Sequence, residues 1–320
     1  MYDTLSRRDF VAATAAAATV SAAVSSDTAT NQLPMRVLGQ TGVRVPLLGY
    51  GTAPTGTRRT LDQGVALLNE ALDFGVTYLD TAPEFAGYGM AQVQVGHVLK
   101  QRRKEAFVVT KTWEPKGDEA RRLLEKNLTE LQIDHADLVY AHSVGDDKMD
   151  PAVVMGKGGV MEFLLKAKEE GLARFIGLSG HCRPWRFLEI ISRFEIDVMM
   201  TAVNFADRYT YNFEQVVWPV AAKKKIGLVA MKTLGGANVK ASGVSHRMMP
   251  EVEVELALRY ALGLPNLSVA VVGMATREEL LQNLAVVKNY QPLAPDELAA
   301  LDRRGRLLAK EWQEHFGPAA

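Results

Sequence analysis

The sequence predicts an α/β protein of the (β/α)8 type, the TIM barrel, with a β-hairpin before the barrel and an extra helix after it. Three observations predict this fold: short apolar runs recur along the chain, segments with helical spacing separate them, and no long polar linker divides the series. Apolar strands that alternate with amphipathic helices are typical of parallel βαβ units. At 320 residues, the chain has a length common for one barrel.

The expected strands are bounded by Gly, Pro or Asp, and they are Val45–Gly51, Val76–Asp80, Ala106–Thr112, Ala136–His142, Arg174–Ser179, Val198–Asn204, Gly227–Lys232 and Leu267–Gly273. The expected helices are Leu61–Phe74, Ala91–Lys100, Ala120–Leu131, Val160–Glu170, Trp185–Arg193, Phe213–Lys224, Val252–Leu262 and Thr276–Val287. An open dinucleotide-binding sheet would carry a Gly-rich turn after its first strand, which the segment Tyr50-Gly51-Thr52-Ala53-Pro54 lacks. Eight repeats without that turn favour the closed barrel.

The two ends of the barrel sequence predict additions to it. Residues 36–45 form an expected hairpin around Thr41-Gly42, which could plug the N-terminal end of the barrel. The segment Pro295–Glu314 predicts one more helix. Lys223, Lys224 and Lys225 indicate a solvated helix end rather than a binding surface.

Composition excludes several classes of function. Lys and Arg together number 37, as do Asp and Glu, so the formal net charge is zero and we expect no nucleic-acid partner. Cys182 is the single cysteine, which excludes an internal disulfide, a Cys-rich zinc site and an iron–sulfur cluster. We expect no metal. Cys182 follows a strand end, and a passive thiol is a better interpretation than a nucleophile.

The first residues have the pattern of an export signal. Ser6-Arg7-Arg8-Asp9-Phe10 precedes an Ala-rich apolar run from Val11 to Val24, and small residues then offer a cleavage site. The run is too short for a membrane span, so we expect no stable membrane insertion after cleavage. Paired arginines resemble the twin-arginine signal. We therefore expect residues 1–30 to be a signal peptide read by the twin-arginine export machinery. We expect residues 31–320 to be a barrel that folds in the cytoplasm and is then exported to the periplasm or another extracytoplasmic location.

Three ionisable residues stand where successive strands should end. They are Asp80, Lys111 and His142, each at the close of an apolar run. Active sites of this fold lie at the C-terminal ends of the strands. An Asp–Lys pair in a partly dry pocket would lower the pKa of a neighbouring phenol, and a histidine beside it could orient a carbonyl oxygen. The set suits carbonyl polarisation and proton transfer, although each residue alone could be structural.

At this point the sequence resembles the aldo/keto reductase superfamily, from Met35 to about Asn289. The resemblance rests on the order and spacing of the stretches 38–42, 49–52, Gly75-Val76-Thr77-Tyr78-Leu79-Asp80-Thr81-Ala82-Pro83, 109–111, 141–143, 174–179, Val229-Ala230-Met231-Lys232-Thr233-Leu234-Gly235-Gly236 and 273–283. It implies a barrel that interconverts carbonyls and alcohols by hydride transfer, with NADPH or NADH as the cofactor and a small carbonyl compound as the substrate.

The resemblance also implies an Asp–Tyr–Lys–His tetrad, of which Asp80, Lys111 and His142 would be members. The family pattern places the proton-donating tyrosine at the position of Phe85, and a phenyl ring cannot donate a proton. Tyr88, which lies between Gly87 and Gly89, is the expected replacement. Glu84 is a more distant substitute.

The cofactor residues that the resemblance implies are Gly51, Thr52, Asp80, Ser179, Met231, Lys232, Leu234, Gly235, Gly273, Met274, Glu279 and Asn283. Several depart from the family. Gly180 and Met200 replace an Asn and a Gln that bind the nicotinamide amide, and Met231 replaces a stacking aromatic residue. Lys232 could contact a phosphate. Glu279 stands where an Arg often binds the 2′-phosphate of NADPH, although Arg277 lies close in sequence and could compensate. The preference for NADPH therefore stays open, and NADH is a second candidate.

Two other functions stay open from the sequence. Phe85 and Met200 are compatible with a catalytically degenerate barrel that binds a small ligand or nucleotide, and Lys111 could form a Schiff base as in barrel aldolases. The substrate is not readable from the sequence. The aromatic residues Trp113, Phe205, Tyr209 and Trp218 are expected in the core or in the wall of an apolar pocket.

Overall fold

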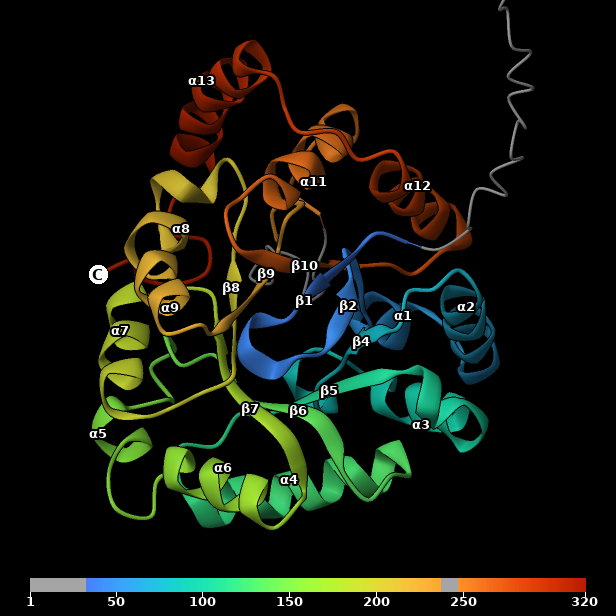
Figure 1. The fold of residues 1–320 in the computed structure, drawn as a ribbon, viewed down its shortest axis with the longest axis vertical. Coiled ribbons are helices and arrows are strands. Elements are labelled where there is room, and N and C mark those ends of the chain that lie inside the picture. Colours follow the sequence, from blue (N-terminus) through green and yellow to red (C-terminus); the bar gives the residue numbers. More distant parts are fainter. Residues whose placement is uncertain (1–32, 237–246) are drawn as a thin grey trace, which may run out of the picture. The chain divides into compact units, whose positions relative to one another are not determined.

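The computed structural model describes residues 33–236 and 247–320, so the predicted signal peptide lies outside the described residues. Eight parallel strands close into a barrel that is surrounded by helices (Figure 1). This confirms the predicted (β/α)8 barrel. Around the barrel the strand order is β10-β3-β4-β5-β6-β7-β8-β9.

The barrel strands are β3 (Leu48–Gly51), β4 (Tyr78–Asp80), β5 (Phe107–Thr112), β6 (Ala136–Ala141), β7 (Ala173–Gly180), β8 (Val198–Ala202), β9 (Gly227–Met231) and β10 (Leu267–Gly273). The barrel closes where β10 pairs with β3, from Ala270 opposite Leu48 to Gly273 opposite Gly51. A Cβ atom on Gly51 would lie 3.1 Å from the backbone nitrogen of Gly273. Glycine therefore permits the close approach of the first and last barrel strands.

The outer helices include α2 (Leu61–Asp73), α3 (Ala91–Arg102), α4 (Gly117–Leu131), α6 (Val160–Glu169), α7 (Pro184–Arg193), α11 (Val254–Leu262) and α12 (Arg277–Lys288). Helix α2 shows why they form. Thr60 and Gln63 make a capping box at its start, and Leu68 and Ala71 are fully buried on its inner face.

The N-terminal hairpin is confirmed as an antiparallel pair, β1 (Met35–Val37) and β2 (Arg44–Pro46). Between its strands Leu38 is fully buried, and it shares an apolar cluster with barrel-interior residues such as Val229 and Val269. The hairpin thus closes one end of the barrel. The predicted strand Val45–Gly51 was wrong as a single unit, because it divides at Leu47 between β2 and β3.

Proline explains the other main differences. The predicted helix Phe213–Lys224 is two helices, α8 (Phe213–Val216) and α9 (Trp218–Lys223), because Pro219 has no N–H to continue a helical ladder. Two short helices were not predicted, α1 (Ala53–Arg58) and α5 (Pro151–Val154), and each carries a proline in its first turn.

Helix α13 (Pro295–Trp312) is the predicted C-terminal helix, and it ends two residues earlier than expected. The tail that follows it folds back onto the loops after β7 and β8. The Tyr211 hydroxyl accepts a hydrogen bond from the Phe316 backbone N–H at 2.8 Å and donates one to the Gly317 carbonyl at 3.1 Å. The backbone N–H of Arg183 donates to the Pro318 carbonyl at 3.2 Å.

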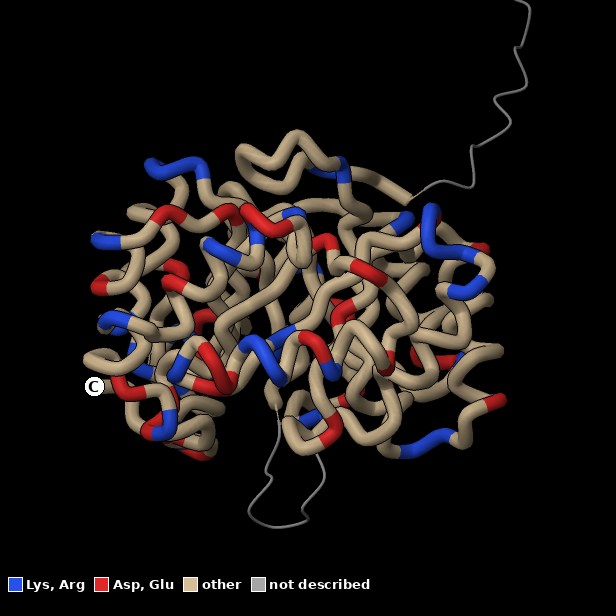
Figure 2. The backbone as a smooth tube through the Cα atoms, turned by 90° about the horizontal axis from the view of Figure 1, so that it is seen from below, with Lys and Arg blue, Asp and Glu red and all other residues tan. Residues whose placement is uncertain are grey.

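Charged residues of both signs are interspersed along the backbone (Figure 2), in keeping with a net charge of zero. Lys223, Lys224 and Lys225 are all exposed at the end of α9, as predicted for a solvated helix end. In the described parts of the chain, every helix is too short or too polar to cross a membrane.

Candidate active site

Three neighbouring strands bring the predicted catalytic residues together. Asp80 is the last residue of β4, Lys111 lies one residue before the end of β5, and His142 directly follows β6. Because the strands are parallel and adjacent, these three ends open on the same side of the barrel. Asn127 on α4 donates a hydrogen bond to the Lys111 carbonyl at 2.9 Å and so fixes the end of β5 from outside.

A buried ion pair forms the centre of the site. The ammonium of Lys111 donates to Asp80 Oδ1 at 2.7 Å, to Asp80 Oδ2 at 2.8 Å and to the Thr81 carbonyl at 2.9 Å. The Lys111 side chain is fully buried and that of Asp80 is 3% exposed. The carboxylate offsets much of the cost of burying the ammonium.

The hydroxyl beside this pair belongs to Tyr88. Lys111 Nζ donates to the Tyr88 oxygen at 3.1 Å, and the Tyr88 hydroxyl donates to Asp80 Oδ2 at 3.1 Å. Gly87 and Gly89 adopt left-handed backbone angles, with φ of +82° and +51°, which allow the tight turn that carries Tyr88 inward. Tyr88 is therefore in contact with both members of the ion pair.

Phe85 lies elsewhere at the mouth. Its ring is 52% exposed and stacks on Trp113, with centroids 6.4 Å apart and an interplanar angle of 10°. Glu84 is exposed in the same short 3-10 turn. Neither side chain occupies the place of the Tyr88 hydroxyl beside Lys111.

Burial shapes the ionisation of this cluster. It lowers the pKa of Lys111, while the charge of Asp80 and its hydrogen bond oppose that effect. Burial, followed by the charge of Asp80, raises the pKa of Tyr88 well above its usual value. The lowered pKa expected for a phenol beside the Asp–Lys pair was therefore wrong, because burial outweighs the nearby ammonium. The phenol consequently keeps its proton at neutral pH, and the neighbouring ammonium is placed to stabilise the oxygen if that proton leaves.

His142 completes the predicted catalytic set. Its Nδ1 lies 2.9 Å from the Ser179 hydroxyl, and its ring contacts Trp113 edge-on with centroids 5.9 Å apart. Burial, followed by the charges of Lys111, His181 and Lys232, holds the pKa of His142 well below its usual range. The imidazole is thus neutral at neutral pH. If Ser179 donates to Nδ1, Nε2 carries the proton and can donate to a ligand.

Two neighbours of this site were missed from the sequence. The His181 ring lies 5.8 Å from that of His142, and the Phe316 ring lies 5.3 Å from that of His181. His181 comes two residues after Ser179, so the rule that strand ends carry function could have found it. No sequence pattern places Phe316, because it arrives through the C-terminal tail.

The predicted cofactor residues lie mainly on the other strands. They stand at or after the ends of β3 (Gly51, Thr52), β7 (Ser179), β9 (Met231, Lys232, Leu234, Gly235) and β10 (Gly273, Met274), and on α12 (Glu279, Asn283). Of these strands β9, β10 and β3 are consecutive in the barrel. We call the ends of these three strands, with α12, the arc. The buried Thr52 hydroxyl donates to the Asp80 carbonyl at 2.8 Å, which connects the arc to the Asp80–Lys111 pair.

The departures from the family pattern have local explanations. A Cβ atom on Gly180 would lie 2.9 Å from the Phe187 ring and 3.3 Å from the Val144 nitrogen, so an asparagine would not fit without movement of these neighbours. Met200 and Met231 are buried in the apolar cluster of the barrel interior. Methionine can still pack against a flat ring from there.

Two buried polar atoms near these strands lack a hydrogen-bond partner in the protein. Thr233 Oγ1, after β9, and Asn283 Oδ1, on α12, have no hydrogen-bond partner. Buried polar atoms normally find partners. Together with the glycines at the strand ends, they fit a polar ligand of nucleotide type along the arc.

The Glu279 carboxylate has a structural role at the start of α12. It accepts hydrogen bonds from the backbone N–H groups of Ala275 at 2.6 Å and Thr276 at 3.2 Å, and so forms the capping box of α12 with the Thr276 side chain. Arg277 instead pairs with Glu70 on α2, at 2.6 Å. Its guanidinium is thereby engaged outside the arc.

The remaining candidates are structural. Phe205 and Tyr209 pack near α13, where the Tyr209 hydroxyl bonds to Asp302, and Trp218 Nε1 donates to Thr201 Oγ1 at 2.9 Å within the core. Burial raises the pKa of the Cys182 thiol to about 11, which is unfavourable for a nucleophile. Of the four candidate aromatics, Trp113 is the one in contact with His142.

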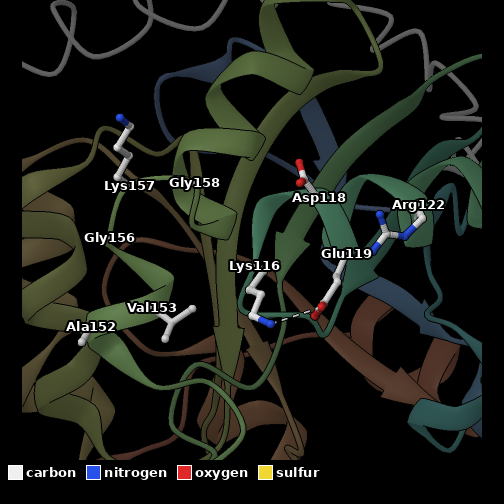
Figure 3. A pocket seen from close by; sticks show the side chains of 9 residues that line it. All are labelled: Lys116, Asp118, Glu119, Arg122, Ala152, Val153, Gly156, Lys157 and Gly158. Atoms are coloured by element: carbon white, nitrogen blue, oxygen red, sulfur yellow. Dashed lines mark hydrogen bonds and ion pairs between the residues drawn. The ribbon is translucent and has the colours of Figure 1, made fainter.

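Figure 3 shows the residues that line a surface hollow of about 550 Å³. It is lined by side chains of both signs at the start of α4, including Lys116, Glu119 and Arg122, and by the loop around Lys157. None of the predicted catalytic or cofactor residues lines it. Within the described residues, no group of three or more His, Cys, Asp and Glu could hold a metal ion.

The mouth of this (β/α)8 barrel carries a buried Asp–Lys pair, a tyrosine hydroxyl and a histidine, a set of groups that can polarise a carbonyl and transfer a proton. The chain belongs to the aldo/keto reductase family, whose profile it matches over residues 47–253.

Individual relatives are distant. The sequence is 24% identical over 300 residues to L-galactose dehydrogenase of Arabidopsis thaliana, covering 83% of this chain and 92% of that protein. It is 25% identical over 226 residues to D-threo-aldose 1-dehydrogenase of a Pseudomonas species, covering 59% and 66%. The structure resembles an aldo/keto reductase of Klebsiella pneumoniae solved with NADP and acetate, with a TM-score of 0.67, 23% identity and coverage of 84% and 94%.

Proposed function

We propose that this protein is an NAD(P)H-dependent oxidoreductase that interconverts a carbonyl and an alcohol by hydride transfer, with Tyr88 as its proton donor. The observation that carries the proposal is the Tyr88 hydroxyl, which lies 3.1 Å from Lys111 Nζ and 3.1 Å from Asp80 Oδ2. Membership of the aldo/keto reductase family indicates NADPH or NADH as the cofactor.

In the reductive direction Tyr88 gives its proton to the carbonyl oxygen of the substrate. The Lys111 ammonium then stabilises the phenolate, and Asp80 holds that ammonium in place with two contacts of 2.7 and 2.8 Å. When bound, the nicotinamide cofactor supplies the hydride to the carbonyl carbon. In oxidation the proton moves back to the Tyr88 oxygen. A proton donor of this kind contributes about 10²-fold to 10⁴-fold to the rate.

His142 orients the substrate in this proposal. Its neutral imidazole, bonded through Nδ1 to Ser179 at 2.9 Å, can present an Nε2–H to the carbonyl oxygen. Because burial keeps the pKa of His142 low, it acts as a hydrogen-bond donor without a net charge.

We propose aldoses as the first substrates to test. Two relatives are named for sugar oxidation, one for L-galactose and one for a D-threo-aldose. The stacked Phe85 and Trp113 rings at the mouth offer a flat apolar surface of the kind that the C–H face of a sugar can contact.

The test is to titrate the full chain separately with NADPH and NADH while following tryptophan fluorescence, and then to assay turnover of galactose and other aldoses with the oxidised cofactors. Saturable cofactor binding with turnover supports the proposal. Cofactor binding without turnover of any aldehyde, ketone or sugar would favour a barrel that only binds a nucleotide. No binding of either cofactor would overturn the proposal.

We further propose that the enzyme acts outside the cytoplasm after export through the twin-arginine pathway. The support is the Arg7-Arg8 pair before an Ala-rich run. That pathway carries folded proteins, so a barrel could leave the cell with its cofactor bound. The twin-arginine machinery would then be a transient partner.

A further inference from the structure

Lys232 has a setting that the proposed proton transfer does not use. It directly follows β9 in a left-handed backbone conformation, with φ of +58°, which is uncommon for a residue with a side chain. The Asn204 side chain holds this turn by donating to the Lys232 carbonyl at 3.0 Å. The backbone of Lys232 is therefore held in a defined turn directly after a barrel strand.

The Lys232 ammonium lies next to the row of rings that leads to His142. Its Nζ is 5.9 Å from the centroid of the Phe316 ring. Phe316 is 5.3 Å from His181, and His181 is 5.8 Å from His142, each measured between ring centroids. One end of the row is thus a cation and the other is the residue expected to orient the carbonyl.

No carboxylate in the described residues forms an ion pair with Lys232, in contrast to Lys111, which is paired with Asp80 at 2.7 Å. Burial lowers the pKa of Lys232 to about 8, and the charge of Lys111 adds to this effect, while Asp80 and Asp207 oppose it. The side chain is still mostly protonated at pH 7. Lys232 is partly buried. An ammonium that is partly withdrawn from water and has no ion-pair partner in the described residues favours an anionic ligand.

We infer that Lys232 binds a carboxylate of the substrate, so that the preferred substrates are acidic aldehydes or acidic sugars rather than neutral ones. The inference rests on the proposed function and names its substrate class. One ammonium with a neutral imidazole beside it matches a singly charged carboxylate. Phe316 and His181 would line the path between the carboxylate and the reacting carbonyl at His142.

The resemblance to the family offers a different ligand for Lys232, a cofactor phosphate. The two ligands, a substrate carboxylate and a cofactor phosphate, predict different effects of replacing Lys232. A substrate contact affects discrimination between acidic and neutral substrates, whereas a phosphate contact affects cofactor affinity and leaves that discrimination unchanged.

The test compares the wild-type full chain with Lys232→Met, Lys232→Arg and the surface control Lys224→Met. Substrates are taken in pairs that differ by one carboxylate, galacturonate with galactose and 4-carboxybenzaldehyde with 4-methylbenzaldehyde. We expect the wild type to favour the acidic member. Lys232→Met should lower the acidic-to-neutral ratio of kcat/KM by about tenfold to a hundredfold, as expected for loss of a charge-assisted contact. Lys232→Arg should restore most of the ratio, and Lys224→Met should not change it.

Two outcomes overturn the inference. One is an unchanged ratio in Lys232→Met together with a weaker Kd for NADPH or NADH, which would assign Lys232 to the cofactor. The other is a wild type without preference for the acidic substrates.

If no compound is turned over, the proposed function fails while the carboxylate site can still be tested. Benzoate and benzamide are then titrated calorimetrically into the protein. Saturable binding of benzoate but not benzamide, lost in Lys232→Met, supports the site. Absence of benzoate binding to the wild type overturns it.

Discussion

At the scale of single residues, the place of a hydroxyl group in the folded site matters more than the sequence position of the residue that carries it. Tyr88 lies three residues after Phe85, yet its oxygen contacts both Lys111 and Asp80 at 3.1 Å. The left-handed glycines on either side allow the loop to present it. In the proposed function this hydroxyl is the proton donor, although the family position carries a phenyl ring.

Replacement of Tyr88 by phenylalanine should lower kcat for carbonyl reduction by about 10²-fold to 10⁴-fold, because the ring is kept and the donor is lost. The Kd of the cofactor, measured by fluorescence titration, should stay within about twofold of the wild-type value. Tyr290→Phe is the matched control, because it makes the same change in a residue that follows α12 rather than a catalytic strand. Unchanged turnover in Tyr88→Phe would remove this residue from the mechanism.

The rate of the reaction should not change near pH 6.5, where a histidine of ordinary pKa would titrate. Burial holds the pKa of both His142 and His181 well below 6.5, so both rings are already neutral at pH 6 and remain so as the pH rises. Burial raises the pKa of Tyr88, which therefore stays protonated over the same range. We expect kcat/KM for a neutral substrate to be flat between pH 6 and 7.5.

Steady-state rates at closely spaced pH values check this prediction. An inflection near pH 6.5 that disappears in His142→Asn would contradict the neutral state of the ring. His135→Asn is the control, because His135 lies at the surface beside Asp134.

The sequence could predict that the three candidate catalytic residues lie together, because each of them stands at or next to the end of a strand. Asp80, Lys111 and His142 follow from strand periodicity and from the rule that parallel strands present their C-terminal ends together. Phe316 could not be predicted, since its place depends on how the tail after α13 packs on Tyr211. The task of Glu279 in a capping box was also missed, although the spacing of Thr276 and Glu279 carries that signal.

At the scale of elements, one residue in the first turn of α12 both caps the helix and is expected to affect the choice between NADPH and NADH. Glu279 caps the helix through the backbone of Ala275 and Thr276, at the position where family members often carry an arginine. Its negative charge would disfavour the 2′-phosphate of NADPH. Capping and charge can be separated by substitution.

Glu279→Arg should tighten NADPH relative to NADH by about tenfold or more, the value of one charge-assisted contact. It should also destabilise the fold by about 1 kcal/mol through loss of the cap. Glu279→Gln is the informative control, because it keeps an oxygen that can cap the helix and removes the charge. Fluorescence titration and thermal unfolding measure the two effects, and an unchanged NADPH-to-NADH ratio in both variants would contradict a role of Glu279 in cofactor choice.

Element boundaries were predictable where a strong local signal exists and not elsewhere. The barrel strands and the helix starting after Thr60 follow from apolar runs and a capping box. The division at Leu47 depends on the hairpin packing across the barrel end, which is a tertiary effect. Pro219 was a readable signal for the break between α8 and α9, because proline disrupts a helix interior.

At the scale of the whole molecule, export is the property with a direct test. Changing Arg7 and Arg8 both to lysine should leave the protein in the cytoplasmic fraction of a bacterial host with the twin-arginine pathway, because the charge is kept and the arginine pair is lost. Fractionation and immunoblotting measure the distribution. The matched control changes Arg121 and Arg122 on α4 to lysine, and equal periplasmic levels in both variants and the wild type would contradict export by this route.

The seam of the barrel, where its first strand pairs with its last, also affects how the chain folds. Strand β3 pairs with β10, and the Arg36 side chain beside the seam donates to the Leu267 carbonyl across 231 positions of the sequence. Contacts of such sequence separation are slow to form, since the entropy of closing a long loop is lost before they are gained. Until then the two unpaired strand edges are open to aggregation. A cell that produces this barrel therefore has to keep an incomplete ring of strands apart from its neighbours until the last strand is in place.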